Sequence, residues 1–385
     1  MANVATKSVL LDESSLREEC LEEKKEVVNL KEIVLTEAIF EFLSETFAHP
    51  VRELIGKGGY GKVFKYTIKE KLESKEDGCD ERVYNLAIKI LIPKRRWLYQ
   101  DFCDNGSALL LGLIHPNISE VKHVIVYNLD LKSFFIRSNL SEFLNSDVIL
   151  GNIQTFSPFG NLSELMKKRV KEDNYFTTDE MLIIIKQILD GIIFLNNNNL
   201  FHSDLKLRNI LIANEEDLTV KLCDFNFLRK FEISSIFYKM CGSLNYMAPE
   251  LFGSTGYGPK IDVFSFGAIV MEILTGKKIF RCLAKRREDF YETTKRIRTL
   301  FIEQFQENKL CFITDDKTKT QIEFFKHSLI RLKDKNLCEN VYKITDIMEI
   351  IVRSLHPIPA KRACFKELLD LTNRALHFKL DTEAM

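Results

Sequence analysis

The chain has 385 residues, of which 45% are hydrophobic, so it is long enough for two or three folded units with sizeable cores. The chain has 55 basic residues (lysine and arginine) and 55 acidic residues (aspartate and glutamate). This balance gives no indication of nucleic acid or an anionic membrane as a partner. No stretch reaches the ~18 uninterrupted apolar residues that a membrane span needs. Nine cysteines without metal-ligand spacing indicate reduced thiols. We therefore expect a cytoplasmic protein, or one in a host cytosol if a pathogen encodes it.

Residues 1–50 are predicted to form a helical extension. Ser15-Leu16-Arg17-Glu18 is a capping-box pattern that predicts the start of one helix. We expect Thr36 to cap a second helix that ends before Pro50. The apolar face of this second helix would comprise Ala38, Ile39, Phe42 and Leu43. Such a face needs burial, so the extension would pack on the rest of the protein or bind a protein partner, and a solvated tail is the alternative.

A group of strands follows in the next hundred residues. Alternating and β-branched residues predict strands at 51–55, 63–68, 83–90, 121–127 and 147–154. A loop is expected over 69–81 and a helix over 97–113. Beyond a connector at 158–161 the pattern is mainly helical, with long buried helices at 181–195 and 261–274.

Five short motifs occur in a fixed order along this framework. They are Gly56-Lys57-Gly58-Gly59-Tyr60-Gly61-Lys62-Val63, Leu86-Ala87-Ile88-Lys89, His202-Ser203-Asp204-Leu205-Lys206-Leu207-Arg208-Asn209, Asp224-Phe225-Asn226 and Ala248-Pro249-Glu250. A glycine-rich turn lets backbone N–H groups approach phosphates, although alone it is a common structural device. A lysine at the end of an apolar strand needs an anion nearby. Aspartate and asparagine more often form turns than bind metals, but three of them at these spacings favour a magnesium site.

Together the motifs resemble a eukaryotic-type protein kinase of the serine/threonine class, from about Val51 to about Phe378. The resemblance implies an α+β fold of two lobes, a small antiparallel-sheet N-lobe at about 51–157 and a larger, mainly helical C-lobe at about 158–378. Residues 1–50 and 379–385 would be an extension and a tail. ATP and Mg²⁺ would bind between the lobes.

The resemblance also assigns roles to residues. Asp204 would accept the proton of the attacking hydroxyl, and Lys206 would neutralise charge on the transferred phosphoryl group. Lys89 would bind the α- and β-phosphates, and Asn209 and Asp224 would hold the metal. The nucleotide would also contact Gly56, Gly58 and Gly61 at its phosphates, and Val63, Ala87 and Leu211 at its adenine. Substrates would be proteins with serine or threonine acceptors.

Further residues match the family pattern and fix its register. Leu110, Val121, His202 and Phe225 match an apolar column that is anchored by Asp262. Lys206 and the segment 242–250 resemble the serine/threonine class, with Ser243 where threonine is usual. Glu250 and Arg362 match a pair that ties this segment to the lower lobe.

Three positions depart from the family. Gly106 stands where a helix glutamate usually pairs with the strand lysine, so the helix is expected to be short or distorted. Ser203 replaces an arginine that usually grips a phosphorylated loop, which removes the main anchor for phosphate at Ser234, Ser235 or Tyr238. Asn226 replaces a glycine, a mild change because asparagine tolerates positive φ.

Two other functions stay open. A pseudokinase would bind nucleotide or partner proteins without turnover, and Gly106 supports it. An interaction role, compatible with catalysis, would use residues 1–50 and the segments 128–146 and 281–344, which are longer than the family usually carries. We also expect Arg208, which precedes Asn209, to attract acidic residues of a substrate.

Overall fold

A computed structural model describes residues 32–46, 51–58, 61–71, 81–91, 106–144, 146–232, 234–276, 278, 292, 295, 299 and 337–377. The chain divides into two compact units, one of residues 1–113 and 120–156 and the other of residues 114–119 and 157–385. The expected first helix at Ser15, most of the helix at 97–113 and most of the segment 281–344 lie outside the described residues. The predicted domain boundaries stay predictions.

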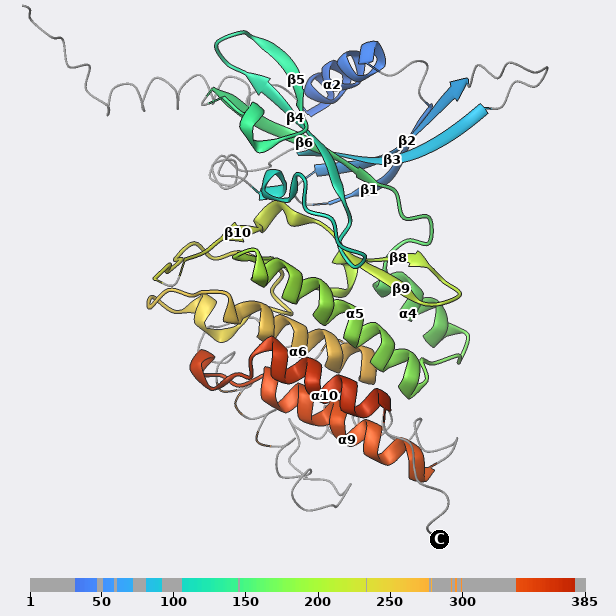
Figure 1. The fold of residues 1–385 in the computed structure, drawn as a ribbon, viewed down its shortest axis with the longest axis vertical. Coiled ribbons are helices and arrows are strands. Elements are labelled where there is room, and N and C mark those ends of the chain that lie inside the picture. Colours follow the sequence, from blue (N-terminus) through green and yellow to red (C-terminus); the bar gives the residue numbers. More distant parts are fainter. Residues whose placement is uncertain are drawn as a thin grey trace, which may run out of the picture. The chain divides into compact units, whose positions relative to one another are not determined.

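A six-stranded antiparallel sheet forms the first unit, in the order β1-β2-β3-β6-β4-β5 (Figure 1). Its strands are β1 Val51–Lys57, β2 Gly61–Lys71, β3 Glu81–Leu91, β4 Val121–Asn128, β5 Ser133–Arg137 and β6 Asp147–Thr155. The five predicted strands are thus confirmed, each within a few residues of its expected ends. The part of the expected 69–81 loop that is described belongs to the ends of β2 and β3.

Strand β5 was missed by the sequence reasoning, which treated 128–146 as an added segment. It pairs antiparallel with β4, from Val124 opposite Arg137 to Asn128 opposite Ser133. The following 3-10 turn, η2 Leu140–Glu142, leads into β6. Arg137 Nε donates to Asp147 Oδ2 at 2.9 Å, and the buried Asn128 Nδ2 donates to the other oxygen at 2.7 Å. Burial alone would raise the pKa of Asp147, but these donors hold it below its usual range.

Helix α2, Glu32–Thr46, covers one face of this sheet. Its Ile39, Phe40 and Leu43 are buried in a cluster with side chains of β2, β3, β4 and β6. Phe40 packs edge-on against Phe64, with ring centroids 4.7 Å apart. The expectation that this apolar helix needs a covering surface is confirmed, and the surface is the sheet of its own chain. Thr36 is not the cap, because the helix begins earlier and buries Thr36 within it.

The described end of the expected 97–113 helix is a 3-10 turn, η1 Gly106–Leu110. Gly106 is buried there, as are Ser107 and Leu110. A 3-10 turn is typical of short, irregular helical segments. The expected distortion around Gly106 is therefore found in the residues that the structure describes.

The second unit is mainly helical. Its long elements are α4 Leu162–Lys171, α5 Thr178–Asn197, α6 Lys260–Thr275, α9 Leu337–Ser354 and α10 Phe365–His377. Helix α6 is buried on all sides, from Ile261 to Thr275, and packs against α5 and α9 (Figure 1). Helices α4 and α5 begin at capping boxes, with Asn161 and Thr177 as the N-caps. The predicted helices at 181–195 and 261–274 are confirmed.

Two short β-ladders in this unit hold the segments that carry the motifs. Strand β7 Leu200–Phe201 pairs with β10 Arg229–Lys230, and β8 Ile210–Asn214 pairs with β9 Thr219–Leu222. The 3-10 turns η3 Leu207–Asn209, η4 Phe225–Phe227, η5 Pro249–Phe252 and η8 Pro359–Lys361 complete the described elements. These ladders place the loops after β7 and after β9 beside each other.

The predicted α+β class, with a small antiparallel sheet and a larger helical part, is confirmed. Within the described ranges, no helix is both long and apolar enough to cross a membrane.

Replacing Leu43 by alanine should lower the free energy of unfolding by about 3 kcal/mol, because it leaves a cavity between α2 and the sheet. Glu41→Ala on the exposed side of the same helix is the control and should change stability little. Urea denaturation followed by circular dichroism would measure both. Equal stabilities for the two variants would show that α2 does not contribute to the core.

Candidate functional site

The loop 202–209 is held in place by one buried carboxylate. Asp262, near the start of α6, accepts the backbone N–H of His202 at 2.6 Å and that of Ser203 at 2.9 Å. Ser203 has a φ of 66°, a left-handed conformation that is strained for a residue with a side chain. Burial raises the pKa of Asp262 to about 6, although His202 and the two N–H donors oppose this. The two bonds fix the strained turn from which Asp204 projects.

Asp204, Lys206 and Asn209 meet on this loop. Lys206 Nζ lies 2.5 Å from Asp204 Oδ2, and Asn209 Nδ2 donates to the backbone oxygen of Asp204 at 2.8 Å and to its Oδ2 at 3.3 Å. The other carboxylate oxygen, Oδ1, is buried and has no hydrogen-bond partner among the described residues. Buried acceptors in native proteins are nearly always paired. This oxygen is therefore suited to receive a hydrogen bond from a bound hydroxyl group.

The segment around Gly242 packs directly on the same loop. Lys206 Nζ also donates to Ser243 Oγ at 2.9 Å. Gly242 has a φ of 93°, and a Cβ built there would lie 2.7 Å from the backbone oxygen of Ser203. Only glycine fits such a close approach. Lys206 thus bridges Asp204 and Ser243, which lies 37 residues beyond Lys206 in the sequence.

Asp224 is joined to the loop through the backbone of its neighbour. Cys223 donates its N–H to the backbone oxygen of Asn209 at 2.9 Å, and His202 Nε2 lies 2.9 Å from the backbone oxygen of Cys223. Asp224 itself is left-handed, with φ 63° and ψ 63°. Asn226 Nδ2 donates to Asp224 Oδ1 at 2.7 Å. The replacement of glycine by Asn226 was expected to be mild because asparagine tolerates positive φ, but Asn226 lies in η4 and does not have a positive φ. Its side chain instead orients Asp224.

The donor set fits a magnesium ion. The NH₂ group of Asn209 is turned towards Asp204, which leaves the amide oxygen on the other side, and Asp224 supplies a carboxylate. These are hard oxygen ligands, which Mg²⁺ prefers, and Mg²⁺ commonly completes its shell with phosphates and water. No group of three or more His, Cys, Asp or Glu side chains suited to a metal occurs among the described residues. Binding of a metal ion by Asn209 and Asp224 stays a prediction.

In the first unit, Lys89 is buried on β3, and both neighbouring strands have a glycine close to the β3 backbone near Lys89. A Cβ on Gly61 of β2 would lie 2.0 Å from the backbone oxygen of Ile90, and one on Gly151 of β6 would lie 2.4 Å from that of Lys89. These two glycines let the flanking backbones lie against β3 on both sides. The strand that carries Lys89 is thereby fixed.

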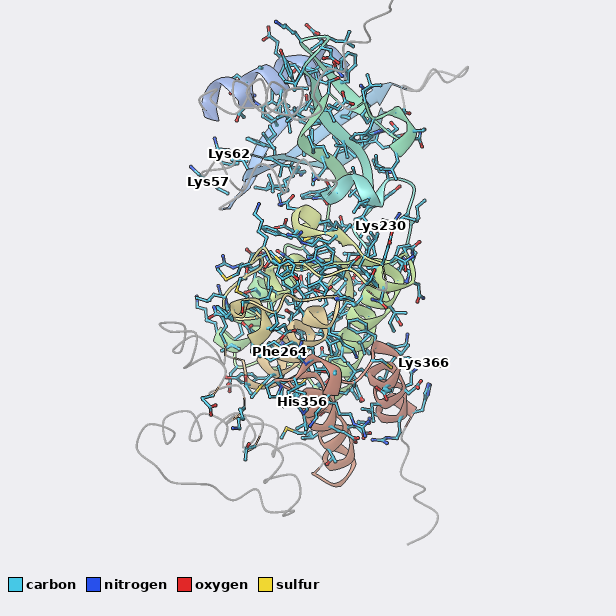
Figure 2. All side chains as sticks on the ribbon, turned by 90° about the vertical axis from the view of Figure 1, so that its left-hand side faces the viewer. Lys57, Lys62, Lys230, Phe264, His356 and Lys366 are labelled. Carbon is cyan, nitrogen blue, oxygen red and sulfur yellow. The ribbon has the colours of Figure 1, made fainter. Side chains whose placement is uncertain are left out.

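The glycine-rich hairpin between β1 and β2 carries extra positive charge. Gly58 donates its N–H to the backbone oxygen of Gly61 at 2.9 Å, and Lys57 lies opposite Lys62 across the two strands. Figure 2 shows both lysines on this hairpin. Like charges directly opposite each other are unfavourable in a ladder unless an anion is near. These lysines, which sequence reasoning did not single out, suit a phosphate-bearing ligand.

The predicted adenine contacts are apolar and partly accessible. Ala87 is buried on β3, whereas Val63 on β2 is half-buried. Leu211 on β8 is also half-buried and forms a bridge with Asn161, which caps α4. Their contribution to a nucleotide site stays a prediction.

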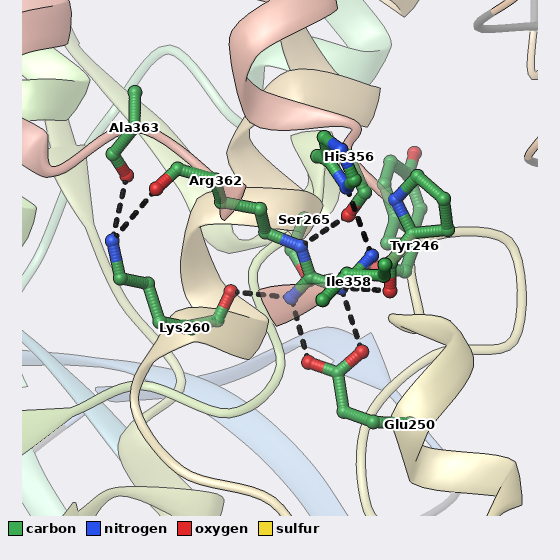
Figure 3. A network of polar contacts seen from close by, with 9 residues as sticks. Tyr246, Glu250, Lys260, Ser265, His356, Ile358, Arg362 and Ala363 are labelled. Atoms are coloured by element: carbon green, nitrogen blue, oxygen red, sulfur yellow. Dashed lines mark hydrogen bonds and ion pairs between the residues drawn. The ribbon is translucent and has the colours of Figure 1, made fainter. Parts of the chain in front are cut away.

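The expected Glu250–Arg362 pair is confirmed as a buried, bidentate ion pair (Figure 3). Arg362 Nη1 and Nη2 donate to the two carboxylate oxygens of Glu250 at 2.6 and 2.7 Å. Its Nε donates to the backbone oxygen of His356 at 2.7 Å, and its guanidinium lies 5.1 Å from the ring of Phe264, a core residue of α6 (Figure 2). Removing one partner of such a pair leaves a buried charge, which is costly. The pair ties the segment after Gly242 to α6.

Arg208 is exposed on η3, against which α4 packs. Nearby, Tyr246 donates its hydroxyl to the buried Glu272 of α6, and Lys278 Nζ lies 5.7 Å from the Tyr246 ring centroid. Burial raises the pKa of Glu272, while Tyr246 and then Lys278, Lys167 and Arg208 lower it. Three cationic side chains, Lys278, Lys167 and Arg208, thus act on this buried carboxylate.

The structure joins Asp204, Lys206 and Asn209 by hydrogen bonds in the second unit, and Asp224 follows Cys223, whose N–H binds the backbone oxygen of Asn209. Leu211 lies on β8 of the same unit, directly after η3. Lys89, Val63, Ala87, Gly56, Gly58 and Gly61 belong to the sheet unit. Sequence reasoning missed the hydrogen bonds that Asp262 and Asn226 make, since the spacing of residues in the sequence does not predict which groups a side chain will bind.

Residues 50–372 match the family model of the protein kinase domain. Mitogen-activated protein kinase 9 of Arabidopsis thaliana is 30% identical over 261 residues, which are 65% of this chain and 44% of that protein. Probable serine/threonine-protein kinase fhkE of Dictyostelium discoideum is 30% identical over 49% of this chain and 25% of its own length. Serine/threonine-protein kinase PLK4 of Drosophila grimshawi is 29% identical over 60% of this chain and 26% of its own length. The chain spans less than half the length of each of these relatives.

Proposed function

The chain belongs to the protein kinase domain family, and we propose that it transfers the γ-phosphoryl group of ATP to serine or threonine hydroxyls of protein substrates. The observation that carries this proposal is the unpaired, buried Oδ1 of Asp204 beside a lysine that also contacts Ser243. The relatives named as serine/threonine-protein kinases support the same acceptor class.

Asp204 would orient the acceptor hydroxyl through Oδ1 and take its proton as the hydroxyl oxygen bonds to the γ-phosphorus. The bond from this phosphorus to the leaving ADP oxygen breaks in the same step. Lys206, whose Nζ lies between Asp204 and Ser243, would neutralise charge on the transferred group. Of the two carboxylate oxygens of Asp204, Lys206 and Asn209 contact Oδ2, so Oδ1 is left for the substrate.

The remaining residues would bind the nucleotide and metal. Lys89 would bind the α- and β-phosphates, and backbone N–H groups of the glycine-rich hairpin would lie over them. Asn209 and Asp224 would hold Mg²⁺, which supplies charge neutralisation at the β- and γ-phosphates when it is bound. Val63, Ala87 and Leu211 would contact the adenine. The fixed strand around Lys89 and the oxygen donors of Asn209 and Asp224 support these assignments.

A pseudokinase is the second candidate, and the buried Gly106 in a 3-10 turn favours it. Such a protein would keep nucleotide or partner binding and lose transfer. Against it stand Asp204, Lys206 and Asn209, which are hydrogen-bonded to one another on the loop 202–209, and Asp224, which follows β9.

The segment 128–146, folded as a strand and a short turn, would be a further surface for protein partners.

We also propose a reducing, cytosolic location. Cys223, Cys241 and Cys364 are free thiols among the described residues, as reduced compartments allow.

Asp204→Asn should lower the rate of phosphoryl transfer by about 10³-fold or more while leaving nucleotide affinity nearly unchanged, because the group acts in the chemical step. Transfer of radiolabelled phosphate from ATP to generic substrates and to the protein itself would measure the rate, and calorimetry would measure binding. Wild-type protein that binds ATP with magnesium but labels nothing would establish the pseudokinase instead.

Substrates should carry acidic or phosphorylated residues before the acceptor. Arg208 is exposed, and the nearby carboxylate of Glu272 is buried and already accepts a hydrogen bond from Tyr246. A positional-scanning peptide library should therefore show several-fold acidic enrichment, since surface charge pairs are weak individually.

Arg208→Glu should reverse this preference, whereas Lys366→Glu, at an exposed position of α10, should not. Enrichment of basic residues that Arg208→Glu leaves unchanged would contradict the assignment.

A further inference from the structure

Tyr257 holds a neighbouring segment at three alternate residues. The backbones of Tyr257 and Phe237 exchange two hydrogen bonds, in which the Phe237 N–H donates at 2.9 Å and the Tyr257 N–H donates at 2.8 Å. The Tyr257 hydroxyl donates to the backbone oxygen of Lys239 at 2.5 Å and lies 3.2 Å from Cys241 Sγ. A tyrosine hydroxyl has one proton to donate, so the thiol is the donor in the second contact. Tyr257 itself is buried and lies just before α6.

The exposure of this segment alternates along the chain. Tyr238 and Met240 are exposed, whereas Lys239 is half-buried and Cys241 is buried. Alternate residues of an extended chain project to opposite sides. The side of the segment that faces Tyr257 is therefore its buried side.

The Phe237 ring fixes the beginning of the same segment. It packs against the ring of Phe201 on β7, with centroids 5.2 Å apart, and against that of Tyr257 at 5.9 Å. The guanidinium of Arg229 lies 5.3 Å from its centroid. Such aromatic and cation–π contacts add to the effect of burying the ring. Because β7 leads directly into the loop 202–209, Phe237 is attached to the part of the fold that also carries this loop.

Gly256 allows the segment to lie this close. It has a φ of 78°, and a Cβ built there would lie 2.2 Å from Ile236 Cγ2 and 3.1 Å from the backbone oxygen of Phe237. Glycine is the residue that combines this backbone conformation with so close an approach. A larger residue at this position would displace the segment from Tyr257.

The segment ends at the candidate site. Gly242 lies against the backbone oxygen of Ser203, and Ser243 Oγ accepts a hydrogen bond from Lys206 at 2.9 Å. The place of the Ser243 hydroxyl therefore depends on the contacts that hold residues 237–241.

We propose that Tyr257 is a positioning residue that, together with the Phe237 ring, holds Ser243 against Lys206 for phosphoryl transfer. The inference rests on the proposed function, in which Lys206 neutralises charge on the transferred group. The contacts that hold the segment use backbone groups, a thiol and aromatic rings, so they do not depend on a phosphate group.

Tyr257→Phe removes the bonds to Lys239 and Cys241 and keeps the ring and the backbone pair. The kcat of phosphoryl transfer should fall about tenfold while the KM for ATP stays unchanged, because Tyr257 acts through the segment and not on the nucleotide. Tyr238→Phe, the same change on the exposed neighbour, is the control and should leave kcat unchanged. Gly256→Ala should reproduce the loss. A Tyr257→Phe protein with the wild-type kcat would contradict the proposal.

A double-mutant cycle with Ser243→Ala tests whether the effect passes through Ser243. If it does, Tyr257→Phe should cause little further loss of kcat in the Ser243→Ala protein. Equal fold-losses in both backgrounds would overturn the proposal. Phe237→Ala should lower kcat as Tyr257→Phe does, and Phe237→Tyr, which keeps a ring, should restore it.

A second readout needs neither nucleotide nor turnover. Burial raises the pKa of the Cys241 thiol, so iodoacetamide should label it slowly in the wild-type protein. Phe237→Ala should speed this labelling about tenfold, as followed by mass spectrometry of the peptides, and Tyr238→Phe should not. Labelling of Cys364, which is exposed on the helical unit, should be the same in all variants.

The labelling separates this proposal from the proposed function. Unchanged labelling of Cys241 in Phe237→Ala would refute the positioning even if the protein is an active kinase. Faster labelling in that variant, with no phosphate transfer by the wild-type protein, would support the hold on the segment while the proposed function fails.

Discussion

The arrangement of the candidate site depends on one buried carboxylate, Asp262, which accepts two consecutive backbone N–H groups from the loop 202–209. The loop needs this support because Ser203 is in a left-handed conformation that costs free energy. Asp262 is available for the purpose because it projects from α6, a helix that is buried on all sides. Asp204, Lys206 and Asn209 thereby take their positions from the core of the second unit.

The same helix fixes the segment that would face a substrate. Ser265 Oγ donates to the backbone oxygen of Tyr246 at 2.7 Å, and Glu272 accepts the Tyr246 hydroxyl. Arg362, stacked on Phe264, holds Glu250 through two short bonds. One buried helix thus positions both the loop 202–209 and the segment whose Ser243 accepts a hydrogen bond from Lys206 of that loop. The departure at Ser203 is compatible with a loop that hydrogen bonds within the second unit hold in place, without the need for a bound phosphate.

Much of this could be predicted from the sequence, because periodicity and motif order are local signals. The strands and the helices 181–195 and 261–274 were predicted within a few residues of their bounds, and the fold class followed. Strand β5 was missed, although Phe134-Phe135-Ile136 has high strand propensity, because the resemblance suggested an added segment there. The start of α2 was misplaced because Thr36 has the chemistry of a cap but lies in the helix interior. The hydrogen bonds of Asp262 and Asn226 join residues through the fold, and the spacing of residues in the sequence does not predict them.

We infer that the two hydrogen bonds to Asp262 hold the loop 202–209 in the geometry that the proposed phosphoryl transfer needs. The most direct test is the single-turnover rate of phosphoryl transfer at saturating ATP in Asp262→Asn, compared with folded wild-type protein. An asparagine has the same size, but its NH₂ group cannot accept a backbone N–H, so one of the two anchors is lost. We predict a fall in rate of about tenfold or more with nucleotide affinity largely kept. A folded Asp262→Asn protein that transfers phosphate at the wild-type rate would show that the loop 202–209 does not need both hydrogen bonds to Asp262.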